Sequence, residues 1–311
     1  MLIVDTLAPL VLLIVLGAGL AHIRFLGEGF IADLNKLAFW IALPALLFRG
    51  AAHAEHASPD IWLLLGVVLS ATLLICGLGW VAARVLALPR QSRGTMMQSA
   101  FRGNLAYIGI PVVTYSLADS KGVNNDTLAT AAIVMALTMA FYNVLAVIVL
   151  QSSRPASPTP RHVSIARPIL TNPLMLSGLT GLLVPFFGLK LPGFLDRTLE
   201  SLGNASVPIA LLCIGGSLAT VQLVGRRVWI VTAALLKVAV LPMITYGLAR
   251  LAGLALMETR IAMVYSTAPT AVAAYIMVKQ MDGDEPLASG SITLSTLLST
   301  FSLAAALWLT R

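Results

Sequence analysis

The stretch that decides the fold reads Gln98-Ser99-Ala100-Phe101-Arg102-Gly103-Asn104-Leu105-Ala106-Tyr107-Ile108-Gly109-Ile110-Pro111. It places an arginine, an asparagine, two glycines and a proline inside a run that is otherwise apolar enough to cross a membrane. In the hydrocarbon of a bilayer, each backbone group that a helix break frees needs a partner, so breaks occur only beside protein or a water-filled cavity. Broken spans form the binding sites of many membrane proteins, and we therefore predict a binding site here.

The composition of the whole chain indicates an integral membrane protein. Of its 311 residues, 58% are hydrophobic and 11% are charged, against roughly 25% charged in ordinary soluble domains. Apolar runs of about 20 residues recur from end to end, without a long polar block between them that could fold as a soluble domain. Cys76 and Cys213 fall within these runs, where we expect them to pack as small hydrophobic residues.

Hydropathy predicts an all-α membrane protein with ten transmembrane helices. The expected spans are residues 4–23, 31–50, 61–86, 94–117, 128–150, 168–188, 198–220, 228–250, 259–279 and 286–309. The first run has Asp5 before it and lacks a basic leader, so it is expected to be a retained span and not a signal peptide. A proline-rich linker at 151–167 divides the chain into two five-helix halves, residues 1–150 and 168–311.

The two halves are expected to form inverted repeats, because an odd number of spans per half makes the second half enter the membrane from the opposite side. Pro44 of span two matches Pro208 of span seven at an offset of 164 residues. Gly103 of span four matches Pro269 of span nine at an offset of 166 residues. Helix breakers at corresponding places predict that broken helices 4 and 9 cross.

The basic residues follow membrane topology. The formal net charge is +7, but lysines and arginines are scattered between apolar runs, which argues against nucleic acid as a partner. The loops on one side hold 11 of them and those on the other side 7, which predicts that both termini lie outside and the linker in the cytoplasm. Arg102 and Lys237 fall inside spans, where a charge costs at least about 2.5 kcal/mol, so both are functional candidates.

Several motifs together resemble the auxin efflux carrier family. They are Leu-Pro-Ala-Leu-Leu-Phe at 43–48, Asn104 with Gly109-Ile110-Pro111, Asn172-Pro173 at the start of span six, and Ala268-Pro269 before Tyr275. The short linker is similar to that of bacterial members and not to the long central loop of many plant PIN-type members. The resemblance implies a scaffold of spans 1, 2, 6 and 7, a transport domain of spans 3–5 and 8–10, and a place in the bacterial inner membrane.

The resemblance also implies a function, that of a secondary, elevator-type carrier of a small organic anion. A mono- or dicarboxylate such as malate or malonate is the expected substrate, bound where helices 4 and 9 cross, and a homodimer through the scaffold helices would fit the family. Plant members have a proline where this chain has Gly103. The alternatives are a sodium-coupled carrier of another organic anion, like the bile acid symporters, a channel, and a non-transporting membrane receptor on the same fold.

The residues at the crossing suit an anion on chemical grounds. Breaks at Gly103 and Pro269 expose the N–H groups of the half-helices that follow, which carry partial positive charge. Side-chain amides, hydroxyls and cations nearby add donors. The predicted substrate-binding residues are Arg102, Gly103, Asn104, Tyr107, Asn143, Lys237, Pro269, Thr270 and Tyr275. The predicted helix breaks or hinges are Pro44, Gly103, Pro111, Pro208 and Pro269.

Each candidate also has a purely structural interpretation. Asn104 could satisfy carbonyls that the break frees, Arg102 and Lys237 could snorkel to the cytoplasmic interface, and the two tyrosines could simply pack. Asn143 could bridge helices instead of touching a substrate.

Other chemistry is not expected. The sequence has no Gly-x-Ser-x-Gly elbow, no His-Glu-x-x-His pair and no phosphate loop, so it predicts neither an enzyme nor an ATP-driven pump. His53 and His56 lie in a loop, where solvation is favoured over a metal site. Aspartates and glutamates are expected near span ends or in loops, so a buried carboxylate relay is not predicted and no cofactor is expected. Coupling to sodium or to protons stays open.

Overall fold

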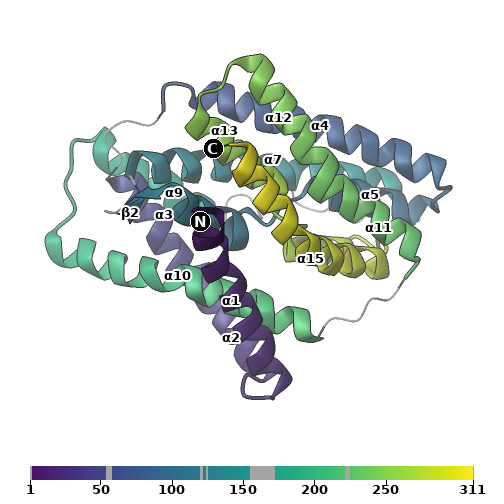
Figure 1. Cartoon of the computed structure of the whole chain (residues 1–311), viewed down its shortest axis with the longest axis horizontal. Coiled ribbons are helices and arrows are strands. Elements are labelled where there is room, and N and C mark those ends of the chain that lie inside the picture. Colours follow the sequence, from purple (N-terminus) through teal and green to yellow (C-terminus); the bar gives the residue numbers. More distant parts are fainter. Residues whose placement is uncertain are drawn as a thin grey trace. The chain divides into compact units, whose positions relative to one another are not determined.

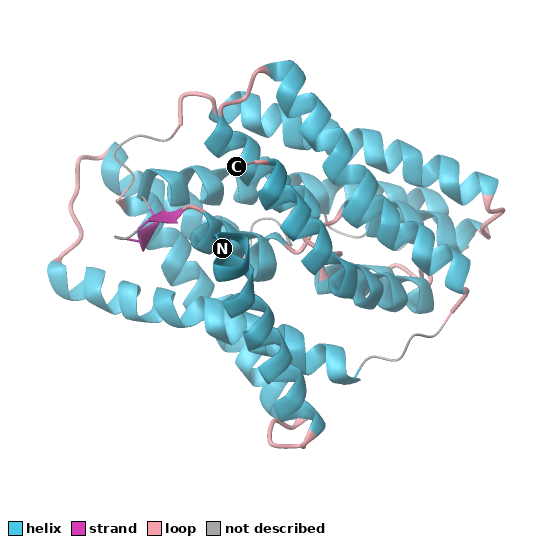
Figure 2. Cartoon of the chain, viewed as in Figure 1, coloured by secondary structure: helices cyan, strands magenta, loops and turns pink. Residues whose placement is uncertain are grey.

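The computed structural model describes residues 2–53, 58–119, 122–123, 125–154, 172–220 and 225–310, and these are helical almost throughout (Figures 1 and 2). The strands β1 (Ala118–Asp119) and β2 (Gly122–Val123) form one short antiparallel pair. The predicted all-helical class is confirmed. Of the linker at 151–167, residues 155–167 lie outside the described part.

The helices, with η marking a π-helical turn, follow the predicted spans. In chain order they are α1 (Leu2–His22), α2 (Glu28–Leu37), η1 (Ala38–Ala42), α3 (Leu43–Ala52), α4 (Ile61–Val85), α5 (Arg90–Phe101), η2 (Leu105–Gly109), α6 (Ile110–Ser116), α7 (Asn125–Ser153), α9 (Pro173–Phe186), α10 (Gly193–Thr220), α11 (Arg227–Leu235), η3 (Leu236–Val240), α12 (Leu241–Ala252), α13 (Leu256–Thr267), α14 (Val272–Gln280) and α15 (Glu285–Leu309).

Six helical segments in the described part are long and apolar enough to cross a membrane. They are Gly29–Ala52, Ile61–Val85, Asn125–Ser153, Gly193–Ser217, Arg227–Ala252 and Glu285–Leu309. Shorter apolar helices cover Ala8–His22, Leu105–Ser116 and Pro173–Phe186. A multi-pass membrane protein is thereby supported, whereas the count of ten spans stays a prediction.

Each π-helical turn ends two residues before a proline. The three prolines are Pro44 after η1, Pro111 after η2 and Pro242 after η3. Proline has no N–H, and its ring clashes with the carbonyl four residues earlier. Widening the helix relieves the clash, because the N–H of the preceding residue then reaches the carbonyl five residues back, as Leu241 does to Leu236. The backbone therefore stays helical through these prolines, and it does so through Pro208 inside α10. Their role as hinges stays a prediction.

The chain divides into two compact units. Unit 1 consists of residues 1–61, 106–137 and 170–221, and unit 2 of residues 62–105, 138–169 and 222–311. The predicted spans 1, 2, 6 and 7 fall in unit 1 and spans 3, 8, 9 and 10 in unit 2, while spans 4 and 5 are shared between them. The division into scaffold and transport domain remains a prediction, as does the boundary between the two five-helix halves.

Two helix pairs build unit 1 through matching glycine contacts. Helix α1 packs along α10, and α9 packs along α3 (Figure 1). A Cβ on Gly17 would lie 2.3 Å from the carbonyl oxygen of Leu212, and one on Gly181 would lie 2.5 Å from that of Phe48. Any side chain at either position would push the helices apart, and such close packing through small residues is common between membrane helices. Gly181 follows Gly17 by 164 residues and Leu212 follows Phe48 by 164, the offset that relates Pro44 to Pro208.

Helices α5, α11, α13 and α15 form the packed frame of unit 2. Helix α11 packs on α5 and on α15, and α13 packs on α12 and α15. A buried apolar cluster joins α5, α11 and α15 to the end of α4, and it consists of Ala83, Leu88, Met96, Ile230, Ala233 and Leu287. Because α5 and α13 are held in this frame, the points where they end are fixed within the unit.

Candidate functional site

The two broken spans meet where α5 and α13 end, inside unit 2. After Phe101 and after Thr267 the chain leaves the helical conformation, and Gly103 then forms an isolated antiparallel β-bridge with Thr270. The predicted breaks at Gly103 and Pro269 are therefore present. The bridge pairs Gly103 with Thr270, one residue beyond the predicted match with Pro269.

At the crossing, backbone N–H groups of each broken span donate to carbonyls of the other span. The Asn104 N–H donates to the Pro269 carbonyl at 2.7 Å, and the Ala271 N–H donates to the Arg102 carbonyl at 2.9 Å. We expected free N–H groups after each break to form a cup for an anion. The structure corrects this expectation at these residues, because two segments that cross as a β-bridge satisfy each other.

Thr270 is fixed by both its backbone and its side chain. Its N–H donates to the Ser295 hydroxyl at 3.0 Å, and its own hydroxyl donates to the Ser99 carbonyl at 2.9 Å. The residue is buried. Thr270 thus anchors the crossing to α15 and α5, and its hydroxyl hydrogen is already engaged.

Arg102 does not snorkel towards an interface but is buried, with 7% of its surface exposed. Its guanidinium donates to Oδ1 of Asn143 at 2.7 Å and to Sδ of Met277 at 3.1 Å. Asn143 lies on α7, so the structure brings together two residues that the sequence analysis singled out separately. One acceptor is a neutral amide and the other a thioether, and neither balances the positive charge.

Lys237 is fully buried and lies in the π-helical turn η3 that precedes Pro242. Its ammonium donates to the Ser266 carbonyl in the last turn of α13, at 2.6 Å. The nitrogen also lies 3.4 Å from the point that a Cβ on Gly103 would occupy. Lys237 therefore points at the crossing and not at an interface.

The two cations approach the crossing from opposite faces. Arg102 has an extended backbone, and side chains of successive extended residues point to opposite sides. Because the Cβ direction of Gly103 faces Lys237, the side chain of Arg102 leaves on the other side. Among the described residues, no carboxylate lies within ion-pairing distance of Arg102 or Lys237.

The remaining predicted residues occupy varied places. Asn104 is buried beside the bridge. The Tyr275 hydroxyl donates to the Glu285 carboxylate at 2.6 Å. The Tyr107 hydroxyl donates to the Asn35 carbonyl at 3.3 Å, and Tyr107 belongs to unit 1, whereas the other predicted substrate-binding residues belong to unit 2. Both hydroxyls thus have a hydrogen-bond partner within their own unit, and the predicted contact of either tyrosine with a substrate stays a prediction.

The sequence analysis did not assign Gln98 and Met277, which together with Arg102 and Asn143 form what we call the arginine cluster. Gln98 lies one helical turn before Arg102 and is fully buried, and its Nε2 lies 3.8 Å from Sδ of Met277. Its Oε1 has no hydrogen-bond partner in the described part of the chain, and the same is true of the Ser99 and Thr138 hydroxyls. The four-residue spacing of Gln98 and Arg102 could have indicated a shared helix face, whereas nothing in the sequence marked Met277.

A narrow gap lies next to the carbonyl that accepts from Lys237. Its walls are Val68, Thr72, Tyr142, Leu241, Thr245, Ala262 and Ser266. Four of these seven residues carry hydroxyl groups, and the space between them is too small to hold a water molecule. In this structure it is therefore a narrow packing gap and not a substrate cavity.

One acidic residue, Glu258, lies near a helix end as expected and is nevertheless buried. Glu258 is in the first turn of α13 and is 4% exposed. It lies eight residues before Ser266, which is about 12 Å along a helix. Glu258 is thus at the opposite end of α13 from the crossing, and it forms no ion pair with Lys237.

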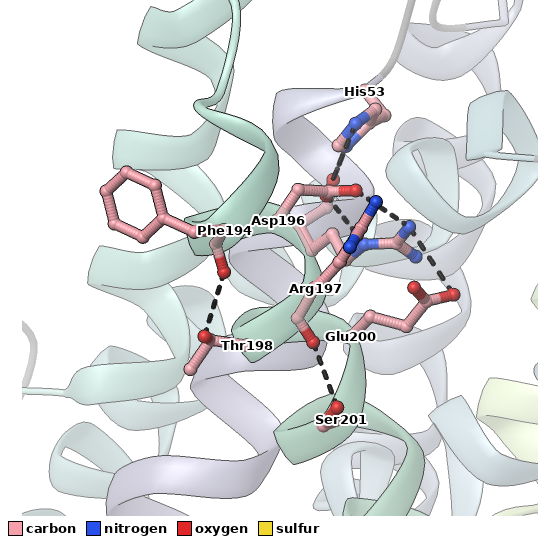
Figure 3. Close-up of polar contacts among 8 residues, drawn as sticks. His53, Phe194, Asp196, Arg197, Thr198, Glu200 and Ser201 are labelled. Carbon is pink, nitrogen blue, oxygen red and sulfur yellow. Dashed lines mark hydrogen bonds and ion pairs between the residues drawn. The ribbon is translucent and has the colours of Figure 1, made fainter.

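Unit 1 holds a second polar cluster, in which the cation is paired with carboxylates. The Arg49 guanidinium lies 2.8 Å from Oδ1 of Asp196 and 3.6 Å from Oε1 of Glu200, and His53 lies 3.4 Å from Asp196. Figure 3 shows Asp196 and Glu200 on the same helix, α10, with a dashed line from Asp196 to His53. His56, the other histidine of the predicted loop, lies outside the described residues. Within the described part, no group of three or more histidines, cysteines or acidic residues could hold a metal ion.

Comparison with known proteins gives a family and several relatives. Residues 2–308 match the model of a family described as "Membrane transport protein". The chain is 24% identical over 313 residues to an uncharacterized transporter of Methanocaldococcus jannaschii, covering 98% of this chain and 97% of that one. It is 26% identical over 292 residues to a protein of Rhizobium meliloti named "Putative malonate transporter", covering 89% and 86%. A further uncharacterized transporter, from Methanothermobacter thermautotrophicus, is 23% identical over 309 residues, covering 96% and 95%.

Proposed function

Because the chain belongs to the membrane transport protein family, we propose that it is a secondary carrier of a small carboxylate that binds at the crossing of the two broken spans. Family membership makes the chain a membrane transporter and not an enzyme, and it confirms the resemblance to auxin efflux carriers. The substrate and the mechanism are the proposal.

One observation supports the proposal: within the described part of the chain, the two buried cations at the crossing have no carboxylate partner. Lys237 has three ammonium donors but a single hydrogen bond, to the Ser266 carbonyl. Arg102 donates to an amide oxygen and a sulfur. A buried unpaired charge is costly and is retained where it has a function. A substrate anion would supply the missing negative charge, and carboxylates form the strongest hydrogen bonds with such donors.

A dicarboxylate matches the two positive charges near the crossing in net charge, whereas a monocarboxylate matches one of them. Malonate is the first candidate, because one of the relatives carries that substrate in its name. Malate has the same charge and is the second.

The carrier mechanism is inferred from symmetry. The two glycine contacts of unit 1 are related to each other by an offset of 164 positions, and the β-bridge of unit 2 pairs residues that are 167 positions apart. Such pairs are what an inverted repeat of two five-helix halves would produce, and carriers of this architecture alternate access by moving one part against the other. We propose that unit 2 is the moving, elevator-like part, that both termini face outside in a bacterial inner membrane, and that a homodimer forms through unit 1.

The test is uptake of radiolabelled malonate, malate and acetate into vesicles that contain the purified protein. We expect saturable malonate uptake that Arg102→Gln and Asn104→Ala each abolish, while both variants remain folded and inserted. Lys279→Met serves as the matched control, because it removes an exposed cation from α14 and should leave uptake unchanged.

The same assay separates the alternatives. Flux that does not saturate would indicate a channel, and binding without flux would indicate a receptor. Uptake of taurocholate that depends on sodium, without uptake of malonate, would indicate a carrier like the bile acid symporters. Normal malonate uptake by Asn104→Ala and Arg102→Gln would contradict the proposed site.

A further inference from the structure

The sulfur of Met277 contacts two polar residues of the arginine cluster. It accepts from the Arg102 guanidinium at 3.1 Å and lies 3.8 Å from the amide nitrogen of Gln98. The second Arg102 contact, to Asn143, places a third polar side chain beside the same guanidinium. Two buried polar side chains, Gln98 and Arg102, therefore contact one thioether, and Asn143 contacts the same guanidinium.

A thioether is a poor partner for these donors. Methionine sulfur is a weak acceptor, whereas a guanidinium carries five N–H donors arranged to fit a carboxylate. The donors that face the sulfur are the Arg102 guanidinium and the Gln98 amide nitrogen. An ionised carboxylate, which only accepts hydrogen bonds, would satisfy these two donors better than sulfur does.

Met277 is more exposed to solvent than the other three residues of the arginine cluster. Gln98, Arg102 and Asn143 are all buried, while Met277 is partly exposed on the short helix α14. Methionine has three rotatable bonds and adapts its shape easily. Its side chain can therefore leave the cluster without a change in the backbone.

From this geometry we propose that Met277 is a displaceable stand-in for the substrate: a carboxylate group takes the place of its sulfur on Arg102 and Gln98 as the substrate binds. The proposal rests on the proposed function and adds two residues, Met277 and Gln98, to the site. Met277 keeps the Arg102 guanidinium partly satisfied while no substrate is bound, and it leaves when a better acceptor arrives.

The test compares two variants of nearly equal shape, Met277→Glu and Met277→Gln. The glutamate brings a permanent carboxylate to Arg102 and should exclude the substrate, whereas the neutral glutamine should not. We expect Met277→Glu to bind malonate at least about 30-fold more weakly than Met277→Gln, the range of a charge-assisted hydrogen bond. Met281→Leu, a buried methionine outside the cluster, is the control.

A second readout needs no substrate. The thermal unfolding midpoint of Met277→Glu in detergent should exceed that of Met277→Gln, because only glutamate can pair with Arg102. Equal malonate affinity and equal midpoints for the two variants would overturn the proposal. If the wild type transports no carboxylate at all, the proposed function fails separately, and the two midpoints still decide whether a carboxylate can replace the sulfur.

Discussion

The two polar clusters of this protein handle buried charge in opposite ways. In unit 1, Arg49 meets two carboxylates and a histidine, and the side chains of Arg49 and Asp196 are 28% and 23% exposed. In unit 2, Arg102 and Lys237 are more deeply buried, and the described residues offer them neutral partners alone. The first cluster is complete, and the second lacks an anion.

This difference distinguishes a structural cluster from a binding site. A paired charge that still contacts water needs nothing further, and its contribution to stability is modest. An unpaired buried charge raises the free energy of the folded state, and a sequence retains it where something else neutralises it in use. Substitutions in either cluster test whether this distinction between a structural cluster and a binding site is correct.

The largest effect is expected from Lys237→Met, which keeps the length of the side chain and removes its charge. Malonate uptake should fall by at least about 100-fold, because a desolvated charge-assisted contact is lost. Uptake rates in reconstituted vesicles measure this, with Lys279→Met as the control. Uptake within a few-fold of the wild type would show that Lys237 is a structural cation, like Arg49.

A smaller effect is expected from Gly103→Ala. The new Cβ would lie 3.2 Å from the carbonyl oxygen of Tyr265 and 3.4 Å from Nζ of Lys237, so it would shift the ammonium without removing it. We expect malonate affinity to fall by about tenfold, roughly 1.4 kcal/mol. Binding is measured by titration of the purified protein.

Gly247→Ala is the matched control for Gly103→Ala, since a Cβ on Gly247 meets nothing within 4 Å. It lies inside α12, where alanine favours the helix over glycine. Unchanged affinity in both variants would mean that the position of Lys237 does not matter for binding.

The smallest effect is expected from Asp196→Asn in the cluster of unit 1. The variant leaves Arg49 with Glu200 as its remaining carboxylate and should lower the free energy of unfolding by about 1 kcal/mol, with uptake unchanged. Chemical unfolding of the two proteins measures the difference.

The control is Asp33→Asn, which removes a largely exposed partner of Lys36 and should change the free energy of unfolding by less than about 0.5 kcal/mol. Loss of uptake in Asp196→Asn would show that the cluster in unit 1 is needed for transport.

Much of the fold was predictable because it depends on local sequence. Apolar runs, helix breakers and their spacing predicted helical spans, the breaks at Gly103 and Pro269, and a crossing within one residue of the one observed. The sequence left open whether Lys237 points inward or towards the interface; in the structure it lies in the π-helical turn before Pro242 and points inward.

The chemistry of the site was less predictable, because it depends on contacts between distant residues. The pairing of Arg49 with Asp196 spans 147 residues, and that of Arg102 with Met277 spans 175. A methionine in an apolar run carries no mark of such a contact. The expectation of free backbone N–H groups at the crossing was wrong in part, because the acceptors of these groups lie on the other broken span.

The most direct test of the central claim is thermal unfolding of the wild type and of Lys237→Met, each with and without malonate. If the crossing holds an unpaired cation that awaits an anion, the wild type should gain about 2.7 kcal/mol at 100 times the Kd of malonate. Lys237→Met should be as stable as the wild type or more stable without malonate, since a buried charge is gone, and should gain nothing from it. A Lys237→Met protein that is less stable without malonate and gains as much as the wild type with it would contradict the account.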